Sequence, residues 1–155
     1  MQDSQGNSPR SGSWNVNMTP APTLRTNVLL RSEQSGGEVS LMENVVPARN
    51  PGPPLHKHDF DEAFYMLAGE LIFQIEDELF TRGAGEIAFA PRNVPHALAN
   101  HSDAEACYLL VCTPAGLERM FVRMAAEAEG TEPPAWALQP APEVTEVGPQ
   151  IAWEH

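Results

Sequence analysis

Basic residues are scarce in this chain, which has 9 Lys and Arg against 21 Asp and Glu and a formal net charge of -12. An acidic surface of that size repels phosphate backbones and anionic lipid headgroups. We therefore expect neither nucleic acid nor a membrane surface as a partner. The 155 residues, of which 42% are hydrophobic, suffice for one domain with a packed core.

Long hydrophobic runs are also missing, and none approaches the roughly 20 residues that a membrane helix needs. The opening residues, MQDSQGNSPRSGSW, have neither the basic start nor the apolar stretch of a signal peptide. These two absences predict a cytoplasmic protein.

Cysteine is rare, and the two that occur, Cys107 and Cys112, lie five residues apart in an apolar run typical of a strand. Extended backbone would separate their Cα atoms by about 16 Å, which is too far for a disulfide. We expect both to be buried free thiols.

The 15 Pro and 11 Gly residues are not spread evenly along the chain. Residues 1–24 show no periodicity and predict a flexible N-terminal arm. Residues 130–155 form a Pro-rich acidic C-terminal tail that cannot be a regular helix or a central strand. Either Trp136 and Trp153 anchor this tail against the body or it is unstructured. The folded body is expected over residues 25–129.

Short strands separated by Gly and Pro turns are the dominant pattern of this body. The predicted strands are 26–32, 38–46, 62–67, 70–76, 86–90, 96–100 and 106–112. Many short strands at this spacing indicate an antiparallel sandwich or barrel.

One helix is predicted after the last strand, with Thr113 as N-cap, Pro114 at the first helical position and Gly130 at the C-terminal stop. Its apolar stripe consists of Leu117, Met120, Phe121 and Met124. We expect the stripe to pack against the sheet or against a second subunit.

Three histidines and one glutamate are spaced so that their side chains can meet at one point. His56 and His58 flank Lys57, so on a strand both imidazoles face one side while the lysine faces the other. Glu62 shares their parity and reaches the same point if the strand stays extended or bulges slightly, and His96 is a fourth candidate. Such a set suits one divalent first-row metal ion, with Fe, Ni, Mn, Co, Cu and Zn left open.

A plainer interpretation exists, because a histidine on a strand is commonly just a polar surface residue. His101 and His155 do not share the pattern, and we expect both to be exposed.

The two segments resemble the two motifs of the cupin superfamily. The first motif corresponds to His56, His58, Glu62 and Gly69. The second corresponds to Gly85, Pro91, Asn93, His96 and Asn100. The resemblance covers about residues 26–125 and has departures: Gly52 stands four residues before His56 instead of the usual six, Asn93 replaces a turn glycine, and the hairpin at 76–78 lacks one. Asn tolerates positive φ better than most residues.

Two segments, FYMLAGEL and LLVCTPAGLERMF, resemble segments of small single-domain proteins related to quercetin dioxygenases. This resemblance implies an all-β, antiparallel jelly-roll barrel with one C-terminal helix. It also implies one divalent metal per chain, held by His56, His58, Glu62 and His96, with positions left for water, substrate or dioxygen. By the same analogy, Glu62 takes the proton from a substrate hydroxyl.

The substrate pocket is expected to be apolar. Residues that share the parity of the ligands are Phe64, Met66 and Leu98, and we expect Phe73 and one face of the 106–112 strand to join them. A register step of one residue would exchange the two faces. Few basic residues lie near the motifs, which argues against a phosphosugar and favours a neutral aromatic or keto compound.

Three functions remain open at this point. The first is a metal-dependent dioxygenase acting on a phenolic or enol compound of flavonol type. The second is a redox-neutral enzyme, such as an aromatic polyketide cyclase or an isomerase, and the third is a binding module without catalysis. Because residues 24–32 include an apolar strand that needs a partner edge, we also expect a homodimer.

Overall fold

The computed structural model describes residues 24–153. The arm expected over residues 1–24 therefore lies outside the described residues except for Leu24, and His155 lies outside them too.

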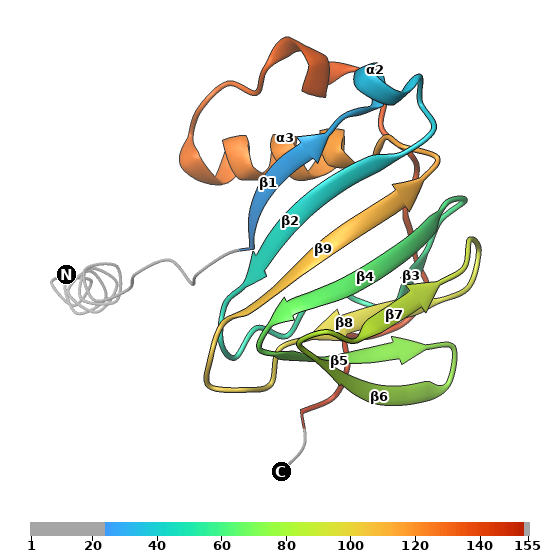
Figure 1. The fold of residues 1–155 in the computed structure, drawn as a ribbon, viewed down its shortest axis with the longest axis vertical. Coiled ribbons are helices and arrows are strands. Elements are labelled where there is room, and N and C mark those ends of the chain that lie inside the picture. The colour runs from blue at the N-terminus through green and yellow to red at the C-terminus, as the bar shows by residue number, and fades with distance from the viewer. Residues whose placement is uncertain (1–23, 154–155) are drawn as a thin grey trace, which may run out of the picture.

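The described residues form two antiparallel sheets that face each other (Figure 1). The first sheet has the order β1 (Arg25–Leu30), β2 (Ser40–Val46), β9 (Ala106–Thr113), β4 (Asp61–Ala68) and β7 (Ile87–Ala90). The second has the order β10 (Thr145–Glu146), β3 (His56–Lys57), β8 (His96–Ala99), β5 (Glu70–Ile75) and β6 (Glu78–Gly83). The predicted all-β antiparallel barrel is confirmed.

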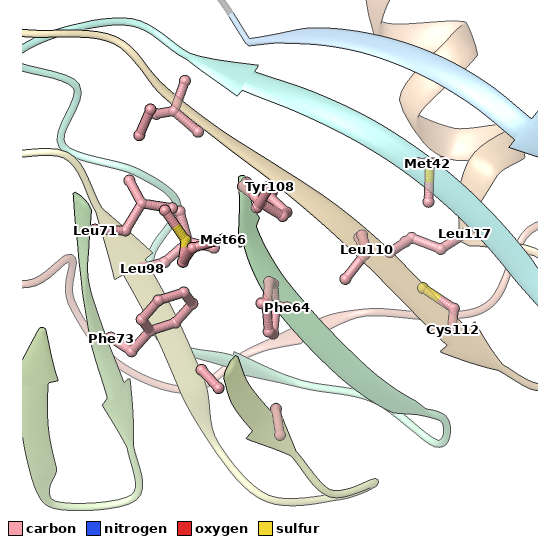
Figure 2. Packing of buried hydrophobic residues seen from close by; sticks show 14 of the residues in the cluster. Met42, Phe64, Met66, Leu71, Phe73, Leu98, Tyr108, Leu110, Cys112 and Leu117 are labelled. Atoms are coloured by element: carbon pink, nitrogen blue, oxygen red, sulfur yellow. The ribbon is translucent and has the colours of Figure 1, made fainter. Parts of the chain in front are cut away.

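Alternation along the strands places one face of each sheet in the core. In β4, the side chains of Glu62, Phe64 and Met66 point inward. The facing residues of β9 are Cys112, Leu110 and Tyr108, respectively. Figure 2 shows the apolar members of this set packed together between the sheets.

Several short elements escaped the strand prediction. The first predicted strand ends at Leu30 because α2 (Ser32–Ser35) follows it. Strands β3, β6 and β10 were not predicted, since two of them span only two residues each and β6 mixes polar and apolar residues. The hairpin between β5 and β6 turns without glycine, because Glu76 itself adopts a φ of 55°.

The main helix, α3 (Leu117–Glu129), begins later than predicted. Thr113 remains in β9 opposite Asp61, so it cannot cap the helix. The N-cap is Gly116, whose φ of 136° suits glycine alone, and Pro114 precedes the helix. The predicted C-terminal stop at Gly130 is confirmed by its left-handed conformation.

A buried carboxylate fixes the start of this helix. Glu118 accepts hydrogen bonds from the backbone N and the hydroxyl of Ser32, both at 2.7 Å, and from the backbone N of Gly116 at 2.8 Å. Burial raises the pKa of the Glu118 carboxyl, but these hydrogen bonds outweigh burial and leave the pKa below its ordinary value. The contact joins α3 to α2, at the end of the molecule opposite β5 and β6 (Figure 1).

The C-terminal tail packs on the barrel over its described part. A 3-10 helix, η2 (Ala135–Leu138), contacts α3, and Arg31 lies over the ring of Trp136 at 4.8 Å. Further along, β10 pairs with β3, Ile151 is buried, and Trp153 stacks on His101. The expectation that His101 is exposed is therefore wrong, because this stacking leaves it partly buried. Of the two alternatives for the tail, the anchored one holds for residues 130–153.

Two smaller predictions concern the cysteines and membranes. Cys107 and Cys112 are free, and Cys112 is buried whereas Cys107 is partly buried. No helix within residues 24–153 is long and apolar enough to cross a membrane.

Candidate metal centre

The four predicted ligands meet at one point, and they come from both sheets. His56 on β3 lies directly opposite His96 on β8 in the second sheet. His58 follows β3 in the connection to β4, and Glu62 lies on β4 in the first sheet. Glu62 does not reach the imidazoles along one extended strand, which was the route considered from the sequence. The chain changes sheets between His58 and Glu62, and this crossing brings the carboxylate to the imidazoles.

The geometry of the cluster is compact. One ligand atom from each of His56, His58, Glu62 and His96 lies within 4.8 Å of the others. Glu62 Oε1 lies 2.9 Å from Nε2 of His58 and 2.8 Å from Nε2 of His96. His58, Glu62 and His96 are only 5%, 4% and 2% exposed, and His56 is half-buried.

Each imidazole is oriented by a hydrogen bond from Nδ1 to a backbone carbonyl two residues away. The pairs are His56 with Pro54 (2.8 Å), His58 with Phe60 (3.0 Å) and His96 with Val94 (2.9 Å). Because a carbonyl oxygen only accepts, each Nδ1 carries the hydrogen, and the Nε2 lone pair of the neutral ring points at the centre. Three lone pairs and a carboxylate facing one another require a cation, so the residues fit a divalent metal ion.

The pKa values of the clustered residues are shifted by burial and by one another. Burial raises the pKa of Glu62, but its contacts with His58 and His96 outweigh burial and hold the pKa at about 2. Burial lowers the pKa of His56. Burial also lowers the pKa of His96, but the Glu62 carboxylate more than offsets this and leaves it raised.

The loops beside the ligands are held by residues of the second motif. Asn93 adopts a φ of 65°, so it fills the place of the expected turn glycine as predicted, and its backbone N donates to the His58 carbonyl at 2.6 Å. Asn100 is fully buried and donates to the carbonyls of Val46, Pro47 and Ala104. These contacts tie the ligand-bearing strands to the ends of β2 and β9.

A cavity of about 580 Å³ opens beside the cluster. Its walls come from both sheets, from α3 and from β10, and most of its lining side chains are apolar. Apart from the four ligands, the polar lining side chains are Asn50, Tyr108 and Glu146. Among the described residues, no Lys or Arg lines it.

The predicted pocket residues fall into two groups. Phe64 and Leu98 line the cavity. Met66 and Phe73 belong to the buried core and are not among the lining residues. The apolar stripe of α3 packs on the barrel, where Leu117, Met120, Phe121 and Met124 all line the cavity.

Tyr108 and Leu110 of β9 also line the cavity, in agreement with the expectation that one face of the 106–112 strand joins the pocket. Tyr108 is the polar exception in this apolar strand. Val144 and Glu146 were not predicted, because they come from the tail, where nothing in the sequence pointed to the cavity.

The basic residues near the motifs lie outside the cavity. Lys57 is exposed, as its parity predicts. Arg49 pairs with Asp103 at 2.8 Å, and Arg92 pairs with Asp61 at 3.1 Å.

The sequence was compared with known protein families. Residues 42–112, a span that contains both motifs, match the cupin domain. Together with the two-sheet fold and the buried ligand cluster, this match supports the cupin superfamily for the chain. No curated protein matches the sequence.

Solved structures share this fold at low identity. A predicted oxalate decarboxylase from Thermotoga maritima is 22% identical, with a TM-score of 0.56 over 59% of this chain and 80% of that chain. The polyketide cyclase RemF from Streptomyces resistomycificus is 22% identical, with a TM-score of 0.53 over 63% of this chain and 69% of that one. The DMSP lyase DddQ from Ruegeria pomeroyi is 23% identical, with a TM-score of 0.51 over 59% of this chain and 47% of that one. At these identities the likeness concerns the fold, which hosts several chemistries.

Proposed function

We propose that the protein is a metal-dependent dioxygenase that acts on a small phenolic or enol compound of flavonol type. One observation carries the proposal: the buried His and Glu cluster opens on an apolar cavity of about 580 Å³. This volume lies in the range of small-molecule sites. With Glu62 and Glu146 in the lining and no described Lys or Arg, the cavity favours a neutral substrate over an anion.

The ligand roles follow from the atoms that face the centre. The Nε2 atoms of His56, His58 and His96 and the carboxylate of Glu62 would hold the ion. When bound, a divalent ion lowers the pKa of a hydroxyl group that coordinates to it. Glu62 directs Oε1 at the Nε2 atoms of His58 and His96, and no hydrogen bond of the described residues involves Oε2. That oxygen is available to accept the proton of a substrate hydroxyl.

The apolar walls complete the site. Phe64, Leu98 and Leu110 offer flat or branched carbon surfaces to an aromatic substrate, and Met120 and Phe121 of α3 cover it from one end. Exclusion of water by these side chains protects an electron-rich substrate anion from reprotonation before it reacts with dioxygen. Both oxygen atoms then enter the product, so the substrate supplies the electrons and no external reductant is required.

Metal content and oxygen uptake test the proposal. Protein purified without chelator should contain about one divalent ion per chain and, loaded with Fe, Ni, Mn or Co, should consume oxygen with a flavonol. Glu62→Gln removes the base and should lower turnover about 100-fold or more, with a smaller loss of metal occupancy. Glu146→Gln is the matched control, because Glu146 also lines the cavity but lies outside the ligand cluster.

A redox-neutral cyclase is the second candidate. The same apolar cavity and carboxylate suit an aromatic polyketide, and RemF, a polyketide cyclase, shares the fold. Zinc as the sole metal, together with conversion of a keto substrate by forms that are inert toward oxygen, would replace the dioxygenase by this alternative. Tight ligand binding without any turnover would instead indicate a binding module.

A further inference from the structure

The cavity has a polar group far from the metal cluster. Tyr108 on β9 lines the cavity and is only 2% exposed, and its ring packs against Phe64 with 5.5 Å between centroids. The proton transfer proposed above does not involve it. A polar atom in an otherwise carbon-lined wall is costly unless it has a hydrogen-bond partner.

The hydrogen bonds of Tyr108 are incomplete within the described residues. Its hydroxyl accepts a hydrogen bond from Nδ2 of Asn44 at 3.1 Å, and it donates none. Oδ1 of Asn44 is buried and has no partner. If the amide oxygen and nitrogen are exchanged, the hydroxyl donates to Oδ1 but the NH₂ group is left unpaired. In both orientations this buried pair keeps an unused hydrogen-bonding group.

The strand register gives the separation of Glu62 and Tyr108 along the sheet, counted between their backbone positions. Glu62 on β4 lies opposite Cys112 on β9, and Met66 lies opposite Tyr108. Four residues of extended backbone span about 13 Å. Figure 2 shows Leu110 between Tyr108 and Cys112 along β9, so an apolar stretch separates the two ends.

We infer that Tyr108, held by Asn44, binds a second oxygen atom of the substrate at the end of the cavity away from the metal ligands. The substrate class is then an elongated aromatic compound with an acidic hydroxyl at one end, a hydroxyl or carbonyl oxygen at the other, and carbon rings between. This inference rests on the proposed function and adds a specificity-determining residue to it.

Binding of two flavonols to the Zn²⁺-loaded protein tests the inference, since zinc does not support oxidation. One flavonol has no hydroxyl on its outer ring, and the other has a single hydroxyl at the far end of that ring. Tyr108→Phe should weaken binding of the hydroxylated flavonol about tenfold and change binding of the other less than twofold, as measured by calorimetry. Metal content is measured on every sample.

Two further variants control for the loss of a buried hydroxyl in general and for a folding defect. Ser40→Ala removes a different buried hydroxyl, one without a hydrogen-bond partner among the described residues. Ser40 is on the same strand as Asn44 but outside the cavity lining, so this change should affect neither ligand. If Tyr108→Phe folds poorly because the Asn44 amide loses its partner, Tyr108→Phe combined with Asn44→Leu removes both polar groups. It should show the same selectivity.

The possible results distinguish the role of Tyr108 from the proposed function. Wild-type protein that binds both flavonols equally, with no loss in Tyr108→Phe, would overturn the role of Tyr108 and leave the proposed function standing. Equal losses for both flavonols would assign Tyr108 to packing alone. Metal-loaded wild type that binds neither flavonol would overturn the substrate class and, with it, this inference.

Discussion

The orientation of the metal ligands depends on contacts that extend only two residues along the chain. Pro54, Phe60 and Val94 present the carbonyls that fix the three imidazoles. Phe60 also stacks its ring on His58 at 3.6 Å with an interplanar angle of 5°. Because these contacts are local, the rings are oriented before any metal arrives, which lowers the entropy cost of binding.

Loss of a single imidazole should therefore remove the metal and leave the barrel intact. We expect His58→Ala and His96→Ala each to reduce bound metal from about one ion per chain to less than about a tenth, because four ligands converge on one ion. The far-UV circular dichroism should not change. His101→Ala, which lies outside the cluster, is the control and should keep full occupancy. Full metal content in either ligand variant would remove that residue from the site.

A second prediction at this scale concerns two glycines with similar backbone angles. Gly52 and Gly85 have φ values of 72° and 87°. A Cβ at Gly52 would overlap the backbone oxygen of Leu98, whereas a Cβ at Gly85 meets nothing within 4 Å. Gly85→Ala should lower the free energy of unfolding by about 1–2 kcal/mol, from φ alone. Gly52→Ala adds the clash and should lower it by about 3–5 kcal/mol. Urea denaturation compares them, and equal losses would contradict the role of the contact.

Much of the site could be predicted at the level of residue types. Spacing alone singled out His56, His58 and His96, because period-two alternation and a turn before His96 are local signals. The route by which Glu62 reaches them could not be predicted, since the change of sheet depends on long-range packing. The hydrogen bond between Tyr108 and Asn44 could not be predicted for a related reason, because the two residues lie 64 positions apart.

At the scale of elements, α3 contributes Leu117, Met120, Phe121 and Met124 to the wall of the cavity. The helix was predicted from its apolar stripe, and its late start was not, because Thr113 continues a strand whose partner is distant in sequence. Arg119 adds a surface contact to Glu33 of α2 at 2.8 Å. The deeper tie is the buried Glu118 carboxylate and its three hydrogen-bond donors.

Acid should loosen this helix through Glu118. Its pKa is lower in the folded protein than in the unfolded chain, so its contribution is present above the ordinary Glu pKa and disappears as the pH falls through the folded value. We expect Glu118→Gln to cost about 1–3 kcal/mol at pH 7, and we expect the difference from wild type to shrink below about pH 4. Urea unfolding at several pH values measures this. Glu127→Gln, on the exposed side of α3, is the control, and a difference independent of pH would contradict the prediction.

At the scale of the whole molecule, the first sheet exposes an apolar outer face. Tyr65 and Leu67 of β4 and Ile87 and Phe89 of β7 are all exposed, and Tyr65 lies directly opposite Ile87. Leu29 on the edge strand β1 is exposed as well. Contiguous exposed apolar surface on a soluble domain is typical of an interaction site.

We propose that this face joins two copies of the chain, with the segment 24–32 contributing at its edge. Light scattering should show a dimer at micromolar concentration, and Phe89→Lys should shift it to monomer without changing metal content. Leu79→Lys, at an equally exposed position on β6 in the other sheet, should remain dimeric. A monomeric wild type would contradict the proposal, and so would dissociation caused by Leu79→Lys alone.

The pairing of β10 with β3 also has a consequence for the order in which the strands can assemble during translation. Strand β3 carries His56 and lies between β8 and β10, and Glu146 follows His96 by about 50 residues. At about 5–20 residues per second, the ribosome needs about 3–10 s to cover that distance. During this interval every histidine ligand has been made, but one edge of β3 is still bare. The segment that carries Glu146 can therefore pair with β3 only after all four predicted ligands have been synthesised.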